Sequence, residues 1–339
     1  RKKHNSEHDS PCPLVHSGDQ APRRKTCTTQ TTRLSHPQMV RLSTNASGQC
    51  YPRSLTTQNA TVVLDNGSTD KFTISLLNDA EKKGCTVRRD LITPRDFHRK
   101  GGHLANIIRG WDGMYDYDFA LPVDCDERLA VFTEKGLSRS KEAIHNAFNA
   151  LKGRQCAFRI DTSLFNVPGR DGWYAPVRHF HKGFVPAKTI SHCDDGQHEP
   201  RSILSDEIAS THFTYLHDHH HPYAEWRKRI KNKVAGLVDP NDEAAIREYI
   251  KIPRAEGAHA VASLLITKKE YYKLYEKEII IMPACGSSDS VIIEGPRINA
   301  TIWDSEHYLK NNPDVKAYTT GTLQHYLRHG FHEGRKIGL

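Results

Sequence analysis

Apolar and polar residues follow a regular pattern only after about residue 60. Thr61 to Leu64 predict a short buried strand, because β-branched residues suit a pleated sheet. A polar turn follows, and from Lys71 apolar residues recur at helical spacing until Gly84, a residue type that commonly ends helices. The pattern therefore predicts a strand, a turn and a helix in close succession.

Strands and helices continue to alternate along the chain. Further strands are predicted in "CTVRRD", "YDFALPV", "CAFRID", "GFVPAKTI" and "ASTHFTYL". Helices are predicted around "HLANIIRGW", around Ile144 to Leu151, and over most of 222–277. This alternation predicts an α/β fold with a mostly parallel sheet flanked by helices.

The segment 1–59 differs in composition from the rest of the 339 residues. Residues 1–60 hold nine Lys and Arg against three acids, and only "QMVRLST" resembles a strand. We expect 1–59 to be a disordered basic segment. The remaining chain is nearly neutral and carries no motif for reading bases, so nucleic acid is not an expected partner.

Cysteine spacing and the lack of long apolar runs indicate the cellular compartment of the protein. The eight cysteines form no C-x-x-C pair, which fits a reducing environment. No apolar run reaches the roughly 20 residues of a membrane span, and the first residues contain no apolar signal core. We expect a cytoplasmic protein without a transmembrane segment.

Two predicted strands end in acidic turns, at Asp65–Asp70 and at Asp124–Glu127. Ligands of open α/β sheets bind beyond the carboxyl ends of the strands. Several carboxylates in one cleft repel one another, and a divalent cation relieves that repulsion. Closely spaced aspartates suit Mg²⁺ or Mn²⁺, which also accept phosphate oxygens as ligands.

The motifs "VVLDNGSTD" and "YDFALPVDCDE", with their flanking strands, resemble nucleotide-sugar glycosyltransferases of the GT-A fold, in particular the bacterial family-2-like subgroup. The resemblance covers about 60–280 and implies a catalytic domain at 60–290. It implies that the turn contacts the base and ribose of a nucleoside diphosphate sugar through Asp65, Asn66, Ser68 and Asp70. Asp124 would face the sugar nucleotide and the metal, and Asp126 would ligate the metal.

The resemblance also implies a reaction. The enzyme would transfer a sugar, with inversion, to a glycan or lipid-linked acceptor of a bacterial envelope polysaccharide, in peripheral association with the inner membrane face. His212 is the first candidate for a further metal ligand and His198 the second. Glu127 and Asp195 are candidates for the base, and the sequence does not decide between them.

Two other stretches have simpler interpretations. Consecutive histidines in "HDHHH" (217–221) cannot all reach one tetrahedral ion, so an exposed loop is expected there. The basic run "WRKRIKNK" (226–233) is expected to be the solvated face of a helix, although it could also help to hold phosphates.

The chain departs from the resembled family at its start. Members of the family begin with a strand and a long helix before the first acidic motif, whereas this chain offers only "QMVRLST" as a possible strand and no amphipathic helix. Arg128 also follows "DCDE" where an apolar residue is usual. The alternative hypothesis is therefore a degenerate, non-catalytic relative that binds a glycan or a partner. The segment 300–339 resembles a small helical module appended to bacterial glycosyltransferases, and we expect a packing or interaction role for it.

Overall fold

The computed structural model describes residues 61–65, 67–91, 93, 99–284 and 288–337, and the backbone of 38–43. Of the segment 1–59, expected to be disordered, only 38–43 is described, and these residues form a strand, β1 (Gln38–Ser43), where "QMVRLST" resembled one. The rest of that segment lies outside the described residues.

The first sheet has seven strands in the order β13-β7-β10-β4-β1-β2-β3. Its strands are β13 (Ile208–Ser210), β7 (Ala157–Ile160), β10 (Lys182–Pro186), β4 (Phe119–Asp124), β1, β2 (Thr61–Leu64) and β3 (Thr86–Arg88). β1 lies in the interior of this sheet, between β2 and β4, and is antiparallel to both.

The second sheet has eight strands in the order β17-β16-β15-β9-β8-β14-β5-β6. Its strands are β17 (Ile298–Ile302), β16 (Val291–Gly295), β15 (Ile280–Pro283), β9 (Arg170–Val177), β8 (Thr162–Val167), β14 (Phe213–His217), β5 (Glu127–Thr133) and β6 (Gly136–Ser138). A further pair is formed by β11 (Ile190–His192) and β12 (Arg201–Ser202).

The fold is mixed α/β as expected, but a mostly parallel sheet is not confirmed. Among the described strands, parallel pairs are β2 with β3, β7 with β13, and β8 with β14, and the other pairs are antiparallel. The physical reason lies in the connections: β5–β6, β8–β9 and β16–β17 are joined by short turns. A short turn joins only antiparallel neighbours, whereas parallel neighbours need a long crossover.

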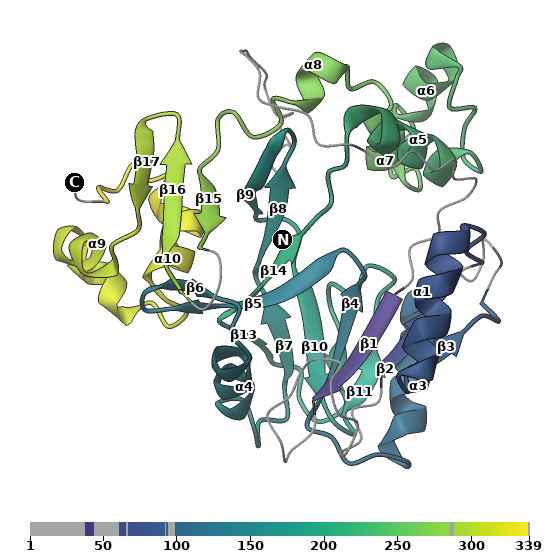
Figure 1. The fold of residues 1–339 in the computed structure, drawn as a ribbon, viewed down its shortest axis with the longest axis horizontal. Coiled ribbons are helices and arrows are strands. Elements are labelled where there is room, and N and C mark those ends of the chain that lie inside the picture. The colour runs from purple at the N-terminus through teal and green to yellow at the C-terminus, as the bar shows by residue number, and fades with distance from the viewer. Residues whose placement is uncertain are drawn as a thin grey trace, which may run out of the picture.

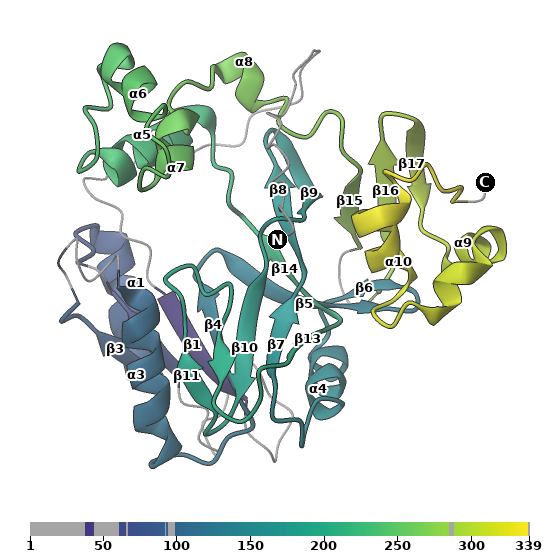
Figure 2. The same ribbon diagram turned by 180° about the vertical axis from the view of Figure 1, so that it is seen from behind.

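The described helices lie in four places (Figures 1 and 2). α1 (Lys71–Lys82) and α3 (Lys100–Asp112) lie together beside the first sheet, and α4 (Lys141–Asn149) lies near β5 and β6. The chain leaves β14 into a cluster of α5 (Tyr223–Val234), α6 (Glu243–Tyr249) and α7 (Ala258–Ser263), followed by α8 (Lys268–Tyr271). The last group is α9 (Ser305–Asn311), the 3-10 helix η1 (Pro313–Ala317), α10 (Thr322–His325) and the π-helix η2 (Tyr326–Gly330).

The C-terminal helices share a hydrophobic core with the second sheet. The rings of Trp303, Tyr308 and Tyr326 contact one another and pack in one cluster with Phe132 of β5 and Leu164 of β8. The 300–339 segment is therefore part of the main packing. No described helix is both long and apolar enough to cross a lipid bilayer.

Candidate functional site

The two acidic strand ends lie at the same edge of the first sheet. In the register of β1, Gln38 is opposite Leu64 of β2 on one side and Asp124 of β4 on the other. Neighbouring strands are about 4.8 Å apart, so the ends of β2 and β4 lie about 10 Å apart. The turn that starts at Asp65 therefore lies beside Asp124.

The Asp65–Asp70 turn is held mainly by local hydrogen bonds. Asp65 is buried, its carboxylate accepts the backbone N–H of Ser68 at 3.0 Å, and its own N–H donates to Arg88. Asp70 caps α1 by accepting the N–H of Thr73 at 2.8 Å. Ser68 Oγ is buried with no hydrogen-bond partner among the described residues. Asn66 lies outside the described residues.

The Asp124–Glu127 turn is instead tied to a distant strand. Lys182, the first residue of β10, places its ammonium 2.9 Å from Asp124 and 3.3 Å from Glu127. Glu127 also accepts the backbone N–H of Asp124 at 2.9 Å. The side chains of Lys182 and Glu127 are only 7% and 1% exposed. A buried cation thus balances two of the three carboxylates that follow β4.

The third carboxylate meets a histidine from the second sheet. His217, the last residue of β14, has its Nε2 atom 3.4 Å from Asp126 and its Nδ1 atom 3.7 Å from Glu127. The antiparallel pairing of β14 with β5 places His217 opposite Glu127. We call Asp124, Asp126, Glu127, Lys182 and His217 the charged cluster.

The charges of this cluster shift one another's pKa values. Burial alone would raise the pKa of Asp124, but Lys182 and Lys100 outweigh it and hold that pKa well below its usual range. Burial raises the pKa of Glu127 despite the opposing charge of Lys182. Burial alone would lower the pKa of Lys182, yet Asp124 and Glu127 raise it overall. The lysine therefore stays charged and pairs chiefly with Asp124.

A loop on the other side of the edge carries Asp195. This exposed carboxylate accepts the N–H of Gly101 in the first turn of α3, at 2.9 Å. A Cβ atom at Gly101 would lie 2.2 Å from the carbonyl oxygen of Cys193, so only glycine allows the helix this close to the loop. Burial lowers the pKa of Lys100, and both Asp124 and Asp195 act against that shift. Lys100 is thus close enough to both the loop and the charged cluster to interact with their charges.

The structure does not bring His212 or His198 to Asp126. His212 is exposed and precedes β14, and its carbonyl accepts from Phe132. Side chains alternate along a strand, so Phe213, Tyr215 and His217 share a face that His212 does not. His198 Nδ1 donates to the carbonyl of His181 at 2.5 Å, and its ring packs against Phe180.

The histidine run 217–221 was expected to be an exposed loop, but its residues make specific contacts with the rest of the protein. His220 exchanges two hydrogen bonds with the amide of Asn166, and its Nε2 atom is 2.9 Å from the Tyr275 hydroxyl. Burial lowers the pKa of His220 to about 3. His219 is exposed by area, yet surrounding protein lowers its pKa well below the usual value.

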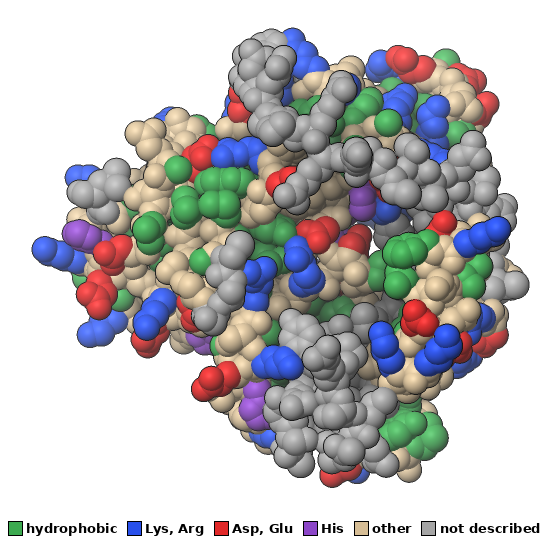
Figure 3. All heavy atoms as spheres, in the orientation of Figure 1, with side chains coloured by type: hydrophobic (Ala, Val, Ile, Leu, Met, Phe, Trp, Pro, Cys, Tyr) green, Lys and Arg blue, Asp and Glu red, His purple; other side chains and the backbone are tan. Residues whose placement is uncertain are grey.

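Figure 3 shows acidic, basic and histidine side chains around a hollow between α1 and the α5–α7 cluster. α5 carries the basic run, and its Arg229 contacts the His221 ring at 2.6 Å. In the described part of the chain, no group of three or more His, Cys, Asp and Glu side chains is arranged to hold a metal ion.

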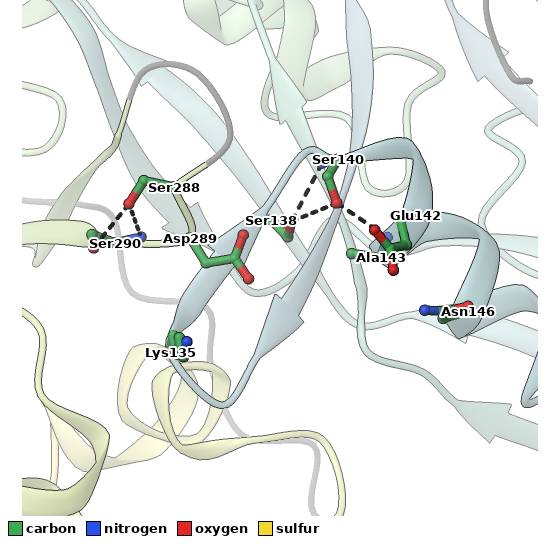
Figure 4. A pocket seen from close by; sticks show the side chains of 9 residues that line it. All are labelled: Lys135, Ser138, Ser140, Glu142, Ala143, Asn146, Ser288, Asp289 and Ser290. Carbon is green, nitrogen blue, oxygen red and sulfur yellow. Dashed lines mark hydrogen bonds between the residues drawn. The ribbon is translucent and has the colours of Figure 1, made fainter.

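A separate open pocket lies away from this edge, between β6, the start of α4 and the segment before β16 (Figure 4). Its lining is polar, and Ser138 pairs with Ser140 while Ser288 pairs with Ser290. Because its hydroxyls already bond to one another, whereas the charged cluster gathers buried charges from separate strands, we place the candidate site at the charged cluster. Comparisons of the chain with family models, with curated proteins and with solved structures give no match.

Sequence reasoning missed Lys182 and His217. Both lie at strand ends, on β10 and β14. His217 begins the "HDHHH" run, which was interpreted as an exposed loop, and nothing near Lys182 in the sequence signals a site. The usable signal for His217 was its position: it follows Phe213 and Tyr215 at period two and ends the strand, where ligands of open α/β sheets bind.

Proposed function

We propose that this chain is a metal-dependent glycosyltransferase that moves a sugar, with inversion, from a nucleoside diphosphate sugar to a glycan or lipid-linked acceptor of a bacterial envelope polysaccharide. A cytoplasmic location at the inner membrane face belongs to the same proposal. The observation that carries it is the meeting of Asp126 and His217 at 3.4 Å. Asp126 of this pair follows the end of β4, at the edge of the first sheet where β2 also ends and the Asp65 turn begins.

The residues present fit a Mn²⁺ or Mg²⁺ ion that is only partly coordinated by protein. Lys182 balances Asp124 and Glu127, and Asp126 lies 3.4 Å from His217 Nε2, so we assign Asp126 and His217 as the two protein ligands. Such ions commonly take their other ligands from water and substrate phosphates. The Glu127 carboxylate near Nδ1 favours a proton there, which leaves Nε2 of His217 free to coordinate. When bound, the ion would stabilise the negative charge on the departing diphosphate.

The turn after β2 suits the donor's nucleoside. The buried Ser68 Oγ has no partner among the described residues and could bond to the ligand, while Asp65 and Asp70 hold the shape of the turn. These aspartates retain free acceptor capacity, because a carboxylate can accept several hydrogen bonds. The proposed role of the turn is to receive the ribose beside Asp124.

Asp195 is the better candidate for the base that deprotonates the acceptor hydroxyl. It is exposed, and the Gly101 N–H fixes its position next to Lys100. Glu127 is 1% exposed and is held between Lys182 and His217, so it suits positioning rather than proton transfer to a substrate.

One observation favours the non-catalytic alternative. Lys182 places a permanent positive charge between two of the carboxylates, so the cluster is partly neutralised without a metal. A relative that had lost transfer could keep this arrangement and still bind a glycan or a partner. It would not need a metal to bind its ligand.

Titration calorimetry with UDP and GDP, each with and without Mn²⁺, tests the proposal. We expect one nucleotide to bind only with Mn²⁺, and Asp126→Ala to abolish that binding. Asp79→Ala is the matched control, since Asp79 is an exposed acid on α1. Absence of nucleotide binding from folded protein would refute the proposal and leave the non-catalytic alternative.

A further inference from the structure

Aromatic side chains border the charged cluster on the side of the second sheet. In the parallel pairing of β14 with β8, His217 is opposite Phe165, and their ring centroids are 4.6 Å apart. Phe180 packs against Phe165 at 5.4 Å, and His219 does so at 4.8 Å. We call Phe165, Phe180 and His219 the aromatic wall.

The wall has a buried support and an exposed surface. Phe165 is 4% exposed, whereas 41% of Phe180 is exposed and His219 is also exposed. Other apolar side chains of the described surface are also exposed, so what distinguishes this pair is that both rings lie on the buried ring of Phe165. Since both exposed rings contact the ring that touches His217, the exposed surface adjoins the charged cluster.

Several contacts hold Phe180 in place. Its carbonyl accepts the hydroxyl of Ser163, a buried residue of β8 two positions before Phe165, at 2.9 Å. The His198 ring packs on it at 5.8 Å. Two residues later the chain reaches Lys182, which contacts Asp124. The position of Phe180 is thus fixed relative to the charged cluster, which lowers the entropy cost of binding a ligand there.

The wall and the donor turn lie on opposite sides of Asp124. The sheet order places β10, with Lys182, on one side of β4, and β1 and β2, with the Asp65 turn, on the other. A nucleoside at the Asp65 turn would therefore leave the aromatic wall open to a second substrate. That substrate would meet an apolar aromatic face bordered by carboxylate, imidazole and ammonium groups.

A pyranose ring matches this surface, because one face of the ring presents C–H groups and its edge presents hydroxyls. Specific pockets combine apolar surface with a few polar groups in this way. We propose that the aromatic wall is a subsite that stacks a sugar ring of a glycan acceptor on Phe180. The inference rests on the proposed function and narrows its acceptor to a glycan whose sugar ring contacts the wall.

The test compares Phe180→Ala and Phe180→Trp with wild type, and uses Phe72→Ala as the control, since Phe72 is another exposed phenylalanine, on α1. Calorimetry measures the binding of three probes: maltotetraose, cellotetraose and the tetramer of N-acetylglucosamine. UDP and GDP with Mn²⁺ are titrated against each variant in parallel. Phe180→Trp also gives a fluorescence readout at the wall.

We expect at least one probe to bind wild type and Phe72→Ala equally, and to bind Phe180→Ala roughly tenfold more weakly, a loss typical of a ring stacked on an aromatic side chain. Phe180→Trp should retain binding and change its emission when the probe is added. Nucleotide binding should be equal in all variants.

Equal glycan affinity in wild type and Phe180→Ala would overturn the inference, and so would the absence of binding by every probe. Weaker nucleotide binding in Phe180→Ala would also overturn it, because the wall would then hold the base. If no nucleotide binds but Phe180→Ala still weakens glycan binding, the subsite stands and the proposed transferase activity fails.

Discussion

The two acidic strand ends have similar sequences but different structures. At Asp65–Asp70, partners within three residues satisfy the acids: Asp65 accepts from Ser68, and Asp70 caps α1. At Asp124–Glu127, the partners are Lys182 and His217, which are 55 or more positions away in the sequence. An acid held by local hydrogen bonds needs no functional explanation, whereas charges gathered from separate strands do.

The largest expected effect is on catalysis at this edge. Asp195→Asn keeps an oxygen that accepts the Gly101 N–H but removes the base, so we expect kcat to fall by roughly 10²–10⁴-fold. The measurement is sugar transfer from the donor whose nucleotide binds in calorimetry. Nucleotide affinity should be unchanged, and Asp79→Asn should have wild-type kcat. An unaltered kcat in Asp195→Asn would remove Asp195 from the mechanism.

The next effect is on stability. Lys182→Met leaves Asp124 and Glu127 without their buried cation, so we expect the free energy of unfolding to fall by about 3–5 kcal/mol. Urea denaturation measures it. Lys152→Met is the control, because its ion pair with Asp118 is partly exposed and should contribute at most about 1 kcal/mol. If both variants lost the same free energy of unfolding, Lys182 would stabilise the fold no more than a surface ion pair does.

The loss of stability caused by Lys182→Met should depend on pH. The folded-state pKa of Asp124 lies below its usual value, so its ion pairing stabilises the fold above about pH 4 and is lost as the pH falls toward the folded pKa. The raised pKa of Glu127 acts in the opposite direction, stabilising at low pH. We therefore expect the stability difference between wild type and Lys182→Met to shrink below about pH 4. Denaturation at pH 7 and pH 3.5 measures this difference.

The smallest effect is expected at the locally bonded turn. Asp70→Ala removes the N-cap of α1 and should lower the free energy of unfolding by about 1 kcal/mol. Asp70→Asn should restore most of that loss, because asparagine also caps helices. Thermal denaturation compares the two variants. If Asp70→Ala instead abolished nucleotide binding at unchanged stability, the contrast between the two turns would disappear.

Local structure was largely predictable from the sequence. The strand at Thr61–Leu64 and the helix from Lys71 were located from β-branched residues and apolar spacing alone. The same patterns located β4 and α4. These patterns are local, so a short stretch of sequence is sufficient to predict each strand or helix.

The arrangement of the strands was not predictable in the same way. β1 pairs with β2 and β4 in antiparallel fashion, and β8–β9 and β15–β16 are hairpins, so the sheets are not mostly parallel. For the same reason the site was predicted only in part: the edge with Asp65 and Asp124 follows from strand ends, but Lys182 and His217 join it through pairing between distant strands. His212 was predicted as a ligand, but it lies five residues before His217, and a shift by an odd number of residues reverses the face of a strand.

The shared core of the C-terminal helices has a consequence for the order of synthesis. Phe132 on β5 packs in the cluster that Tyr326 and Leu327 complete, and nearly two hundred residues separate them. At ribosomal rates of about 5–20 residues per second, the early strand would wait about 10–40 s for its final partners. During that interval the apolar face of the second sheet would be available to chaperones, and premature termination before Trp303 would leave it permanently uncovered.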